Sequence, residues 1–486
     1  MVQSLKNVEM FMFLCYNNVW IFYNKRKKNV LKEFFAPTDM TVGSPIKSII
    51  NFTLPMLIGN IAQQLYSTVD SIVVGKYIGD SALAAVGSAM PIVNLLLVLF
   101  IGISVGSNIM VSQYYGSRSR ENLSYSIGNS ITVTAIACVI LIAVATPFIR
   151  PVLTLLNTPD TIIDGCYDYL FISIIGCAGM AYYNILGSII RGMGDSVSAL
   201  VYLLVATVLN IALDIYFVAG LNMGIGGVAL ATVIAQLVSS ALCIFKLAKM
   251  KDYFDFEWKY FIPKSDTVKT IIRLGLPSGL TQAIFSSAMI IVQSLTNLFG
   301  DQFIAANVVV MRVDGFAMMP NFSFGTALTT YAGQNVGAKK LDRVVQGARQ
   351  GTLLAVGCSA IITVVILLFG KPLMGLFTDT AELVDLSYNL MKILAVGYIA
   401  MAVTQSLSGI MRGAGDAMTP MWISLITTVA LRIPVAYGIS YFTTTPELPH
   451  GIKECIQISL LVTWVMGAFI TAAFYAGGKW KNKAIK

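Results

Sequence analysis

Charged side chains are scarce in this sequence. Asp, Glu, Lys and Arg together make up 12% of its 486 residues, whereas soluble domains contain about 25%. Hydrophobic residues make up 56% of the chain, and the mean hydropathy is +0.75. A soluble fold of this length could not bury so much apolar surface. The composition therefore excludes a soluble domain and predicts an integral membrane protein.

Histidine is nearly absent, and the usual cysteine motifs are missing. His450 is the single histidine, and none of the seven cysteines stands in a CxxC pair. Zinc sites and Ser-His or Cys-His catalysis usually need more of these residues. The sequence contains no Walker loop for ATP either. We therefore expect neither an enzyme nor an ATPase, and no cofactor.

Long apolar runs dominate the chain instead. Each is about 20 residues or longer, which is enough to cross the hydrocarbon core as a helix, and none alternates like a β-strand. The predicted spans cover about 48–72, 83–111, 125–148, 168–190, 197–220, 226–249, 271–298, 303–331, 346–369, 387–410, 418–440 and 455–477. The predicted fold is therefore an all-α integral membrane protein with twelve transmembrane helices.

Basic residues gather in alternate loops of this plan. They stand at positions 25–28 before the first span, in loops such as the one with Lys339 and Lys340, and in the tail. The opposite loops carry acids such as Asp160 and Glu447. The positive-inside rule then places both termini in the cytoplasm. We expect the chain to lie in the plasma membrane. The net charge of +9 is thus a topology signal, and we expect no nucleic-acid partner.

The chain repeats itself with an offset of 221 or 222 residues. The phrase IIRGMGDS at 189–196 returns as IMRGAGDA at 410–417, and Gln113 returns as Gln334. Because each copy holds six spans, the two copies keep the same orientation and form a parallel repeat. We expect an N-terminal extension over 1–43, an amino-terminal lobe over 44–250, a cytoplasmic linker over 251–270, a carboxy-terminal lobe over 271–478 and a basic tail over 479–486.

The repeated RGxGD phrase could be a phosphate loop or a structural turn. A GxG pair without a third glycine is weak evidence for a nucleotide. Each copy follows the fourth span of its lobe, where glycine allows a tight turn and Asp195 or Asp416 can cap the next helix. We therefore predict a structural turn.

The first 39 residues do not fit the plan. The apolar stretch 10–23 is too short to span a membrane, is followed by KRKK and lacks a signal-peptide cleavage site. We expect that the assigned start lies upstream of the real one and that translation begins at Met40. The alternative is an interfacial helix that anchors on acidic lipid.

Acids inside a membrane are costly to bury and are therefore functional candidates. Asn210 and Asp214, four residues apart, share one face of the fifth span, and Asp70 lies in the first. In the second copy Asp70 and Asp214 are replaced by Val292 and Ala436. Because a purely structural acid would more easily be kept twice, we interpret the two acids as functional; caps or bridges between helices are the alternative.

Other polar residues in the spans have more ordinary explanations. Gln63 shares a face with Asp70, and Asn184 and Thr232 lie in the fourth and sixth spans, where helix–helix hydrogen bonds are an equal alternative. Pro55 should bend the first helix fifteen residues before Asp70, although its match Pro277 leaves a frame role open.

Three more charged residues lie in the second lobe. Arg312 and Asp314, two residues apart, should point away from each other, and Arg432 should pair with an acid across the cavity. We interpret Arg312, Asp314 and Arg432 as structural counter-charges that line the cavity.

The chain resembles the multidrug and toxic compound extrusion (MATE) family from about residue 44 to the end. The resemblance rests on LPMLIGNIAQQLYSTVDSIVVGKYIGDSALAAVG in the first span, the paired RGxGD turns, NIALD in the fifth span and GQNVGAKK after the eighth. It is nearest to the DinF-like branch, which implies a polar network at Gln63, Asp70, Tyr169, Asn184, Asn210, Asp214 and Thr232, with Pro55 as the bending proline. The carboxy-lobe acids of the NorM-like branch are absent from spans seven and ten, where Gln282, Gln293 and Gln405 stand.

The resemblance implies an antiporter. A cation, H⁺ or Na⁺, would enter and bind at Asp70, Asn210, Asp214 and Thr232, and an organic, cationic and amphipathic drug or dye would leave. The same oxygens could hold sodium or a proton, so the ion stays open. We expect a monomer in contact with membrane lipid. The alternatives are a lipid-linked oligosaccharide flippase, which would need basic cavity residues such as Arg312 and Arg432, and a membrane-embedded enzyme, for which no nucleophile and base are visible.

Overall fold

The computed structural model of the chain describes residues 37–156 and 158–485. Contacts divide the chain into Met1–Thr38 and Asp39–Lys486, and the second of these units carries the features below. The predictions for the first 39 residues, an assigned start upstream of Met40 or an interfacial helix over 10–23, concern a stretch of which residues 1–36 lie outside the described residues.

Every described element with regular secondary structure is helical. The first half contains α3 (Pro45–Tyr77), α4 (Asp80–Gly116), α5 (Arg120–Leu155), α6 (Asp160–Ile175), α7 (Cys177–Gly192), α8 (Ser196–Asp214), the π-helical η1 (Ile215–Gly220) and α9 (Gly224–Lys249). The second half contains α10 (Ser265–Asn297), α11 (Asp301–Gly337), α12 (Leu341–Met374), α13 (Ala381–Ala395), α14 (Gly397–Gly413), α15 (Met418–Leu425), the π-helical η3 (Ile426–Arg432), α16 (Ile433–Phe442) and α17 (Cys455–Ala476).

Each predicted span corresponds to one of these helices or to consecutive helical segments. Within residues 37–156 and 158–485, nine helices are long and apolar enough to cross a membrane, or eleven if each of two bent helix pairs is one span. The predicted span 48–72 corresponds to α3, which has 33 residues and stands outside that count. The predicted fold class, an all-α multi-pass membrane protein, is confirmed.

The two bent pairs occupy the same place in the two halves. The fourth span is divided into α6 and α7, bent by 48°, and the tenth into α13 and α14, bent by 45°. Gly176 and Gly397 stand at these breaks, 221 residues apart. A Cβ atom on Gly176 would collide with Val233 of α9, and one on Gly397 would collide with Trp464 of α17. Glycine is therefore needed at each bend because a neighbouring helix packs directly against it.

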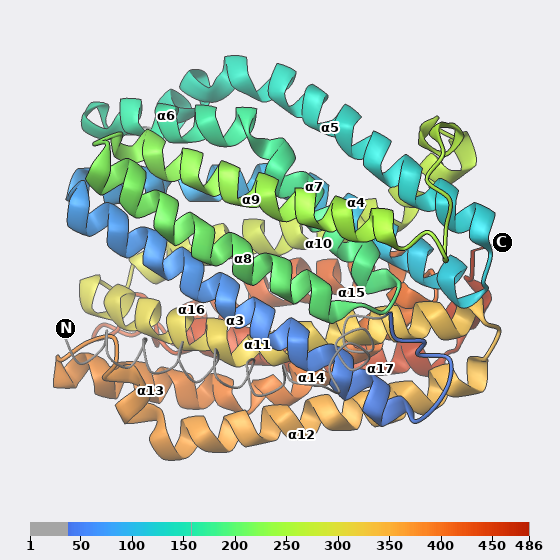
Figure 1. Cartoon of the computed structure of the whole chain (residues 1–486). Helices are drawn as coiled ribbons and strands as arrows, with labels where there is room; N and C mark the ends of the chain where they lie inside the picture. The colour runs from blue at the N-terminus through green and yellow to red at the C-terminus, as the bar shows by residue number, and fades with distance from the viewer. Residues whose placement is uncertain (1–36, 157, 486) are drawn as a thin grey trace, which may run out of the picture. The chain divides into compact units, whose positions relative to one another are not determined.

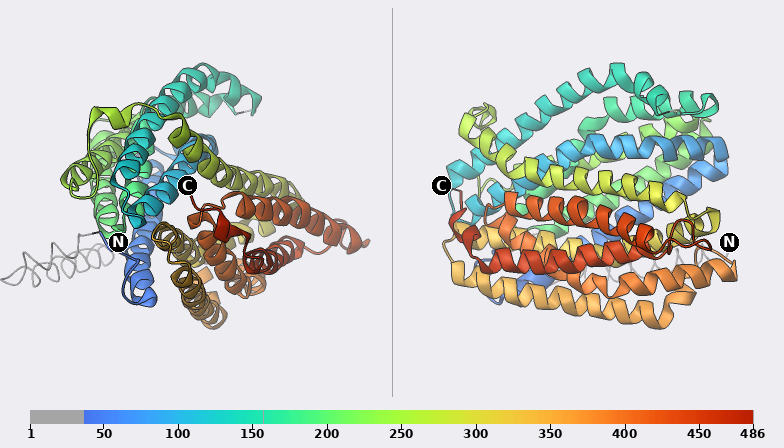
Figure 2. Two further views of the ribbon diagram at one scale, coloured as in Figure 1. Left: turned by 90° about the vertical axis from the view of Figure 1, so that its right-hand side faces the viewer. Right: turned by 180° about the vertical axis from the view of Figure 1, so that it is seen from behind.

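The halves form two groups of helices, drawn from blue to green and from yellow to red in Figure 1 and seen from two further sides in Figure 2. They meet where α4 packs against α10 and α11. The helix α3 belongs to both groups. Ile49 and Phe52 near its start are buried with residues of α11 and α12, whereas Val73 and Val74 near its end are buried in the core of the first half. The first helix therefore connects the two lobes.

The RGxGD phrases form tight turns, as predicted. Gly194 and Gly415 have φ angles of 96° and 98°, which favour glycine. The Asp195 carboxylate accepts the backbone N–H of Ser198 at 2.8 Å, and the Asp416 carboxylate accepts that of Thr419 at 3.3 Å. Each aspartate thus caps the following helix and keeps its turn short.

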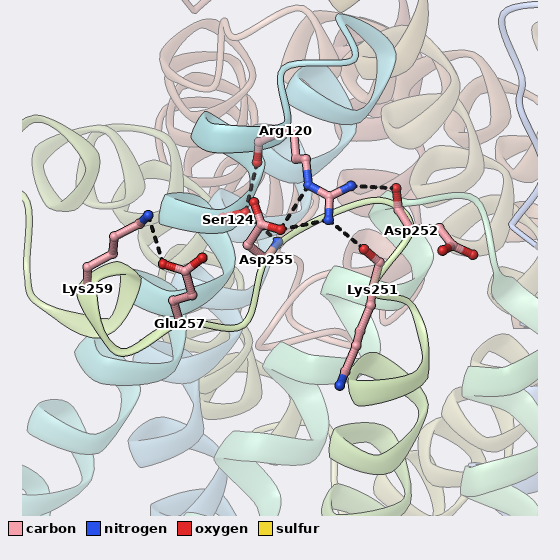
Figure 3. Close-up of polar contacts among 7 residues, drawn as sticks. All are labelled: Arg120, Ser124, Lys251, Asp252, Asp255, Glu257 and Lys259. Atoms are coloured by element: carbon pink, nitrogen blue, oxygen red, sulfur yellow. Dashed lines mark hydrogen bonds and ion pairs between the residues drawn. The ribbon is translucent and has the colours of Figure 1, made fainter.

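The segment between the lobes is held against α5. Figure 3 shows the Arg120 guanidinium between the Asp255 carboxylate, at 2.7 Å, and the backbone carbonyls of Lys251 and Asp252, at 2.7 and 2.9 Å. Farther along, Asn129 donates to the carbonyl of Tyr260 at 2.9 Å, just before α10 begins. The linker is therefore an ordered connection that fixes where α10 starts.

Candidate functional site

Asp70 and Asp214 meet inside the first lobe. Asp70 lies on α3 and Asp214 is the last residue of α8, where η1 begins. Asp214 is fully buried, and no hydroxyl, amide or ammonium donor among the described residues hydrogen-bonds either of its carboxylate oxygens. The two carboxyl groups lie close enough to interact with each other. Because two like charges repel, a proton or a cation that binds here would reduce the repulsion between the two carboxylates.

Tyr169 joins the two acids from a third helix. It lies on α6, is buried, and interacts electrostatically with both Asp70 and Asp214. Its hydroxyl donates to the sulfur of Met90 on α4 at 3.8 Å, a weak contact. The tyrosine therefore borders the acid pair and separates it from the apolar packing around Met90.

Asn210 and Thr232 extend the site from α8 to α9. Asn210 is fully buried one turn before Asp214, and its Nδ2 donates to the Thr232 hydroxyl at 3.4 Å. The side-chain amide oxygen of Asn210, Oδ1, has no hydrogen-bond partner among the described residues. A buried carbonyl oxygen beside two acids is a suitable ligand for a cation. The structure thus brings together Asp70, Tyr169, Asn210, Asp214 and Thr232 from four helices.

The other predicted members of this network lie differently. The Asn184 side chain donates to the Met180 carbonyl of its own helix at 2.7 Å, and its backbone carbonyl accepts the Ser104 hydroxyl at 2.8 Å. Gln63 lies on an exposed part of α3, about two turns before Asp70. Their predicted supporting roles stay predictions.

Pro55 lies within the continuous helix α3, among the residues that contact the second lobe. Before it, Ile49 and Phe52 pack with the second lobe, and after it Asn60 donates to the Ser323 hydroxyl of α11 at 2.9 Å. Since proline removes one hydrogen bond of a helix, α3 is weakest close to its contacts with the second lobe.

The second lobe contains a different charged group. The Tyr398 hydroxyl of α14 donates to the Asp314 carboxylate of α11 at 2.8 Å, and Asp314 interacts electrostatically with Arg432 at the end of η3. The Arg432 Nε has no hydrogen-bond partner among the described residues, and Arg312 is exposed. Here an acid and a base attract each other, whereas the two acids of the first lobe repel each other.

Sequence reasoning singled out neither Tyr398 nor the π-helical segments. A tyrosine in an apolar run carries no periodic signal, and its contact with Asp314 joins two helices that are far apart in sequence. The π-helical segment η3 ends two residues before Pro434, whose missing N–H interrupts the regular helical ladder. A proline in the middle of a predicted span was the one available signal.

Comparison with known proteins identifies the family. The family model MatE matches twice, over residues 55–216 and 277–438, so each match lies in one half of the chain. The two matches begin at Pro55 and Pro277, which occupy matching positions of the internal repeat. The chain belongs to the MATE family. Members of this family are membrane transporters, and the alternative of a membrane-embedded enzyme is rejected.

Relatives and solved structures agree with this MATE assignment. The "Probable multidrug resistance protein YoeA" of Bacillus subtilis is 30% identical over 90% of this chain and 95% of its own length. The "Probable multidrug resistance protein NorM" of Thermotoga maritima is 25% identical over 90% of this chain and 94% of its own length. A solved MATE structure in complex with MaL6 has a TM-score of 0.85 at 23% identity and covers 90% of this chain and 97% of its own. The DinF-like branch stays a prediction.

Proposed function

We propose that this MATE protein is a cation-coupled antiporter that exports organic, cationic and amphipathic compounds across the plasma membrane by alternating access. One observation carries the proposal: the acids Asp70 and Asp214 lie close enough to interact inside the first lobe, where Asp214 is fully buried, and the equivalent residues of the second lobe are Val292 and Ala436. The names of the relatives, which are multidrug resistance proteins, support the class of substrate.

The acid pair would couple ion binding to movement through α3. A proton or Na⁺ that binds between Asp70 and Asp214 reduces their repulsion and lets the two helices pack more closely. Because α3 also contacts the second lobe through Asn60 and Phe52, a shift of Asp70 would be transmitted along α3 to the other lobe, first at Asn60 and then, past Pro55, at Phe52. One elementary charge moving through 100 mV supplies about 2.3 kcal/mol, enough for a modest drug gradient.

The coupling ion is H⁺ or Na⁺. Within the described part of the chain no three His, Cys, Asp or Glu side chains gather around a metal position. Sodium would therefore need the oxygens of Asn210 and Thr232 in addition to the acids Asp70 and Asp214. A proton needs only the acid pair. No organic cofactor, ATP or nucleic acid enters this mechanism.

Orientation and assembly follow from the same proposal. The basic loops favour both termini in the cytoplasm, so the coupling ion would enter from outside. The substrates are small organic compounds such as drugs and dyes, and the protein is surrounded by membrane lipid. A monomer suffices because both lobes come from one chain. The flippase alternative is not favoured, since Arg432 faces Asp314 and Arg312 stands alone as a basic candidate.

The test is ethidium efflux from proteoliposomes under an imposed sodium gradient and, separately, a proton gradient. Asp214→Asn should abolish gradient-driven efflux because it removes one of the two charges that the ion compensates. Asp164→Asn is the matched control, since Asp164 is an exposed acid of the same lobe that pairs with Arg150 at 2.7 Å. The control variant should transport like the wild type.

The gradient that drives efflux in the wild type names the ion. Gradient-driven efflux that persists in folded Asp214→Asn would remove Asp214 from the coupling site. Absence of efflux under either gradient in the folded wild type would contradict antiport and favour a flippase.

A further inference from the structure

Gln113 and Gln334 hold the two lobes together by a reciprocal pair of hydrogen bonds. They are matching residues of the repeat, both buried near the ends of α4 and α11. The Gln113 Nε2 donates to the Gly413 carbonyl at 2.8 Å, and the Gln334 Nε2 donates to the Gly192 carbonyl at 3.1 Å. Gly192 and Gly413 belong to the RGxGD phrases of the opposite lobes. Each lobe therefore binds the RGxGD turn of the other lobe through a hydrogen bond from a glutamine side chain to a glycine carbonyl.

The same two amide groups also bind both end segments of the described chain. The Gln334 Oε1 accepts the backbone N–H of Met40 at 2.9 Å, and the Gln113 Oε1 accepts that of Ile485 at 2.9 Å. The segment at Met40 is held further by Asn335, whose Nδ2 donates to the Met40 carbonyl at 3.2 Å. Each glutamine thus joins three segments: its own helix, the turn of the opposite lobe, and the segment at Met40 or at Ile485.

Glycine allows the two helix ends to approach closely enough for these contacts. A Cβ atom on Gly116, at the end of α4, would collide with the Gln334 carbonyl, and one on Gly337, at the end of α11, would collide with the Gln113 carbonyl. One turn or more deeper, the Thr330 hydroxyl donates to the Asn108 side chain at 3.4 Å, a further hydrogen bond between α11 and α4. The backbones of the lobes therefore touch at this end, and no substrate can pass between them here.

We propose that Gln113 and Gln334 form a latch that closes the cytoplasmic end of the transport path, and that the segments at Met40 and Ile485 lock it. The proposal rests on alternating access, as proposed above. Loading from the cytoplasm requires the lobes to separate at this end, so both cross-lobe hydrogen bonds must break in every cycle. Release of Met40 and Ile485 leaves each amide oxygen without its donor and makes opening easier.

Spin labels on the full-length protein can measure the opening directly. Glu121→Cys and Asp342→Cys place labels at matching, exposed positions at the starts of α5 and α12, with the native cysteines replaced. Pulsed electron spin resonance in lipid nanodiscs then gives the ratio of long to short distances. The latch variants are Gln113→Met and Gln334→Met, which keep the side-chain volume. The control is Asn129→Met, a buried amide that binds the linker and not the opposite lobe.

Each latch variant should raise the ratio of open to closed molecules about tenfold, because it removes two hydrogen bonds with a combined contribution of about 1.4 kcal/mol. A chain shortened to end at Lys483 loses the Ile485 contact alone and should raise the ratio about threefold. Asn129→Met should lower the thermal midpoint without changing the ratio. A structural role of the glutamines would lower the midpoint in the same way and leave the distances unchanged.

Unchanged distances in both folded glutamine variants would overturn the latch. If Asp214→Asn still abolishes coupled efflux in that case, the proposed function stands without it. If neither variant folds, Gly337→Ala, which pushes the helix ends apart, must give the same shift, and its failure to do so would also overturn the latch. A wild type without gradient-driven efflux would instead contradict the proposed function.

Discussion

Asp195 and Asp416 stand at the same position of the two repeats, but their surroundings differ. The Asp195 carboxylate meets the Lys246 ammonium of α9 at 2.8 Å, and both side chains are largely buried. Within the described part of the chain Asp416 has no such basic partner and hydrogen-bonds Thr419 alone. The repeat therefore offers a natural control: the same turn and the same cap, with and without an ion pair.

We predict that Asp195→Asn destabilises the protein more than Asp416→Asn. Asparagine caps a helix about as well as aspartate, so both variants keep their turns. Asp195→Asn in addition deprives Lys246 of its carboxylate, which should lower the free energy of unfolding by about 1–3 kcal/mol. Thermal unfolding in detergent measures the difference. Equal midpoints for the two variants would mean that the Asp195–Lys246 pair contributes nothing to stability.

The residues of the candidate ion site could be predicted only in part. Asn210 and Asp214 were recognisable because a spacing of four places them on one helix face and because an acid in an apolar run is rare. That Asp70 meets Asp214 depends on the packing of α3 against α8, and no local pattern encodes it. Gln113 and Gln334 were visible as a repeat, but an offset shows equivalence between positions and says nothing of contact between them.

At the scale of elements, the linker between the lobes depends on one charged contact. Figure 3 shows Arg120 bridging three linker positions, and its guanidinium lowers the pKa of Asp255 below the ordinary carboxyl value of about 3.9. Because the folded-state pKa is lowered, the contact stabilises the linker above the ordinary pKa. This contribution is lost as the pH falls through the lowered pKa.

Hydrogen exchange of the linker amides should therefore rise below about pH 4, after correction for the intrinsic exchange rate. In Asp255→Asn the linker amides should exchange at all pH values as fast as those of the wild type do at low pH. Their exchange should therefore show no additional rise in acid. Glu257→Gln is the control, because the exposed Glu257–Lys259 pair contributes little. An acid transition that persists in Asp255→Asn would assign the effect to another carboxyl group.

The spans could be predicted from hydropathy, but neither their ends nor their interruptions could: α5 runs from Arg120 to Leu155, beyond the predicted 125–148. Apolar runs of about 20 residues predict a span whether or not the helix is bent. At the bends, Gly176 and Gly397 are needed because Val233 and Trp464 occupy the space that a side chain would take. This requirement comes from another helix, so it appears only when the packing is known.

At the scale of the whole molecule, the two lobes share a frame and differ in charge. The first lobe holds two acids that interact with each other, and the second holds Asp314, Tyr398 and Arg432, in which acid and base compensate. Two acids that repel each other lose this repulsion when one of them takes up a proton or when a cation binds between them. An acid and a base that attract each other need no ion. The asymmetry therefore favours coupling in the first lobe and a structural role for the charges of the second.

This difference predicts that loss of an acid in the second lobe lowers stability, whereas loss of an acid in the first lobe abolishes coupled transport. Asp314→Asn leaves Arg432 without its counter-charge and should lower the free energy of unfolding by up to about 3 kcal/mol. The double variant Asp314→Asn with Arg432→Gln removes both charges and should recover most of that loss. Its gradient-driven ethidium efflux should remain within about threefold of the wild type, whereas Asp214→Asn should fold normally and lose coupling.

Thermal unfolding and proteoliposome efflux, measured on the same preparations, separate the two roles. Recovery of stability in the double variant would identify Asp314 and Arg432 as partners, because unrelated residues would give additive losses. Loss of coupled efflux in a stable double variant would contradict the structural role. The ion would then act on charges in both lobes, and α3, which contacts both, would have to respond to two sites rather than one.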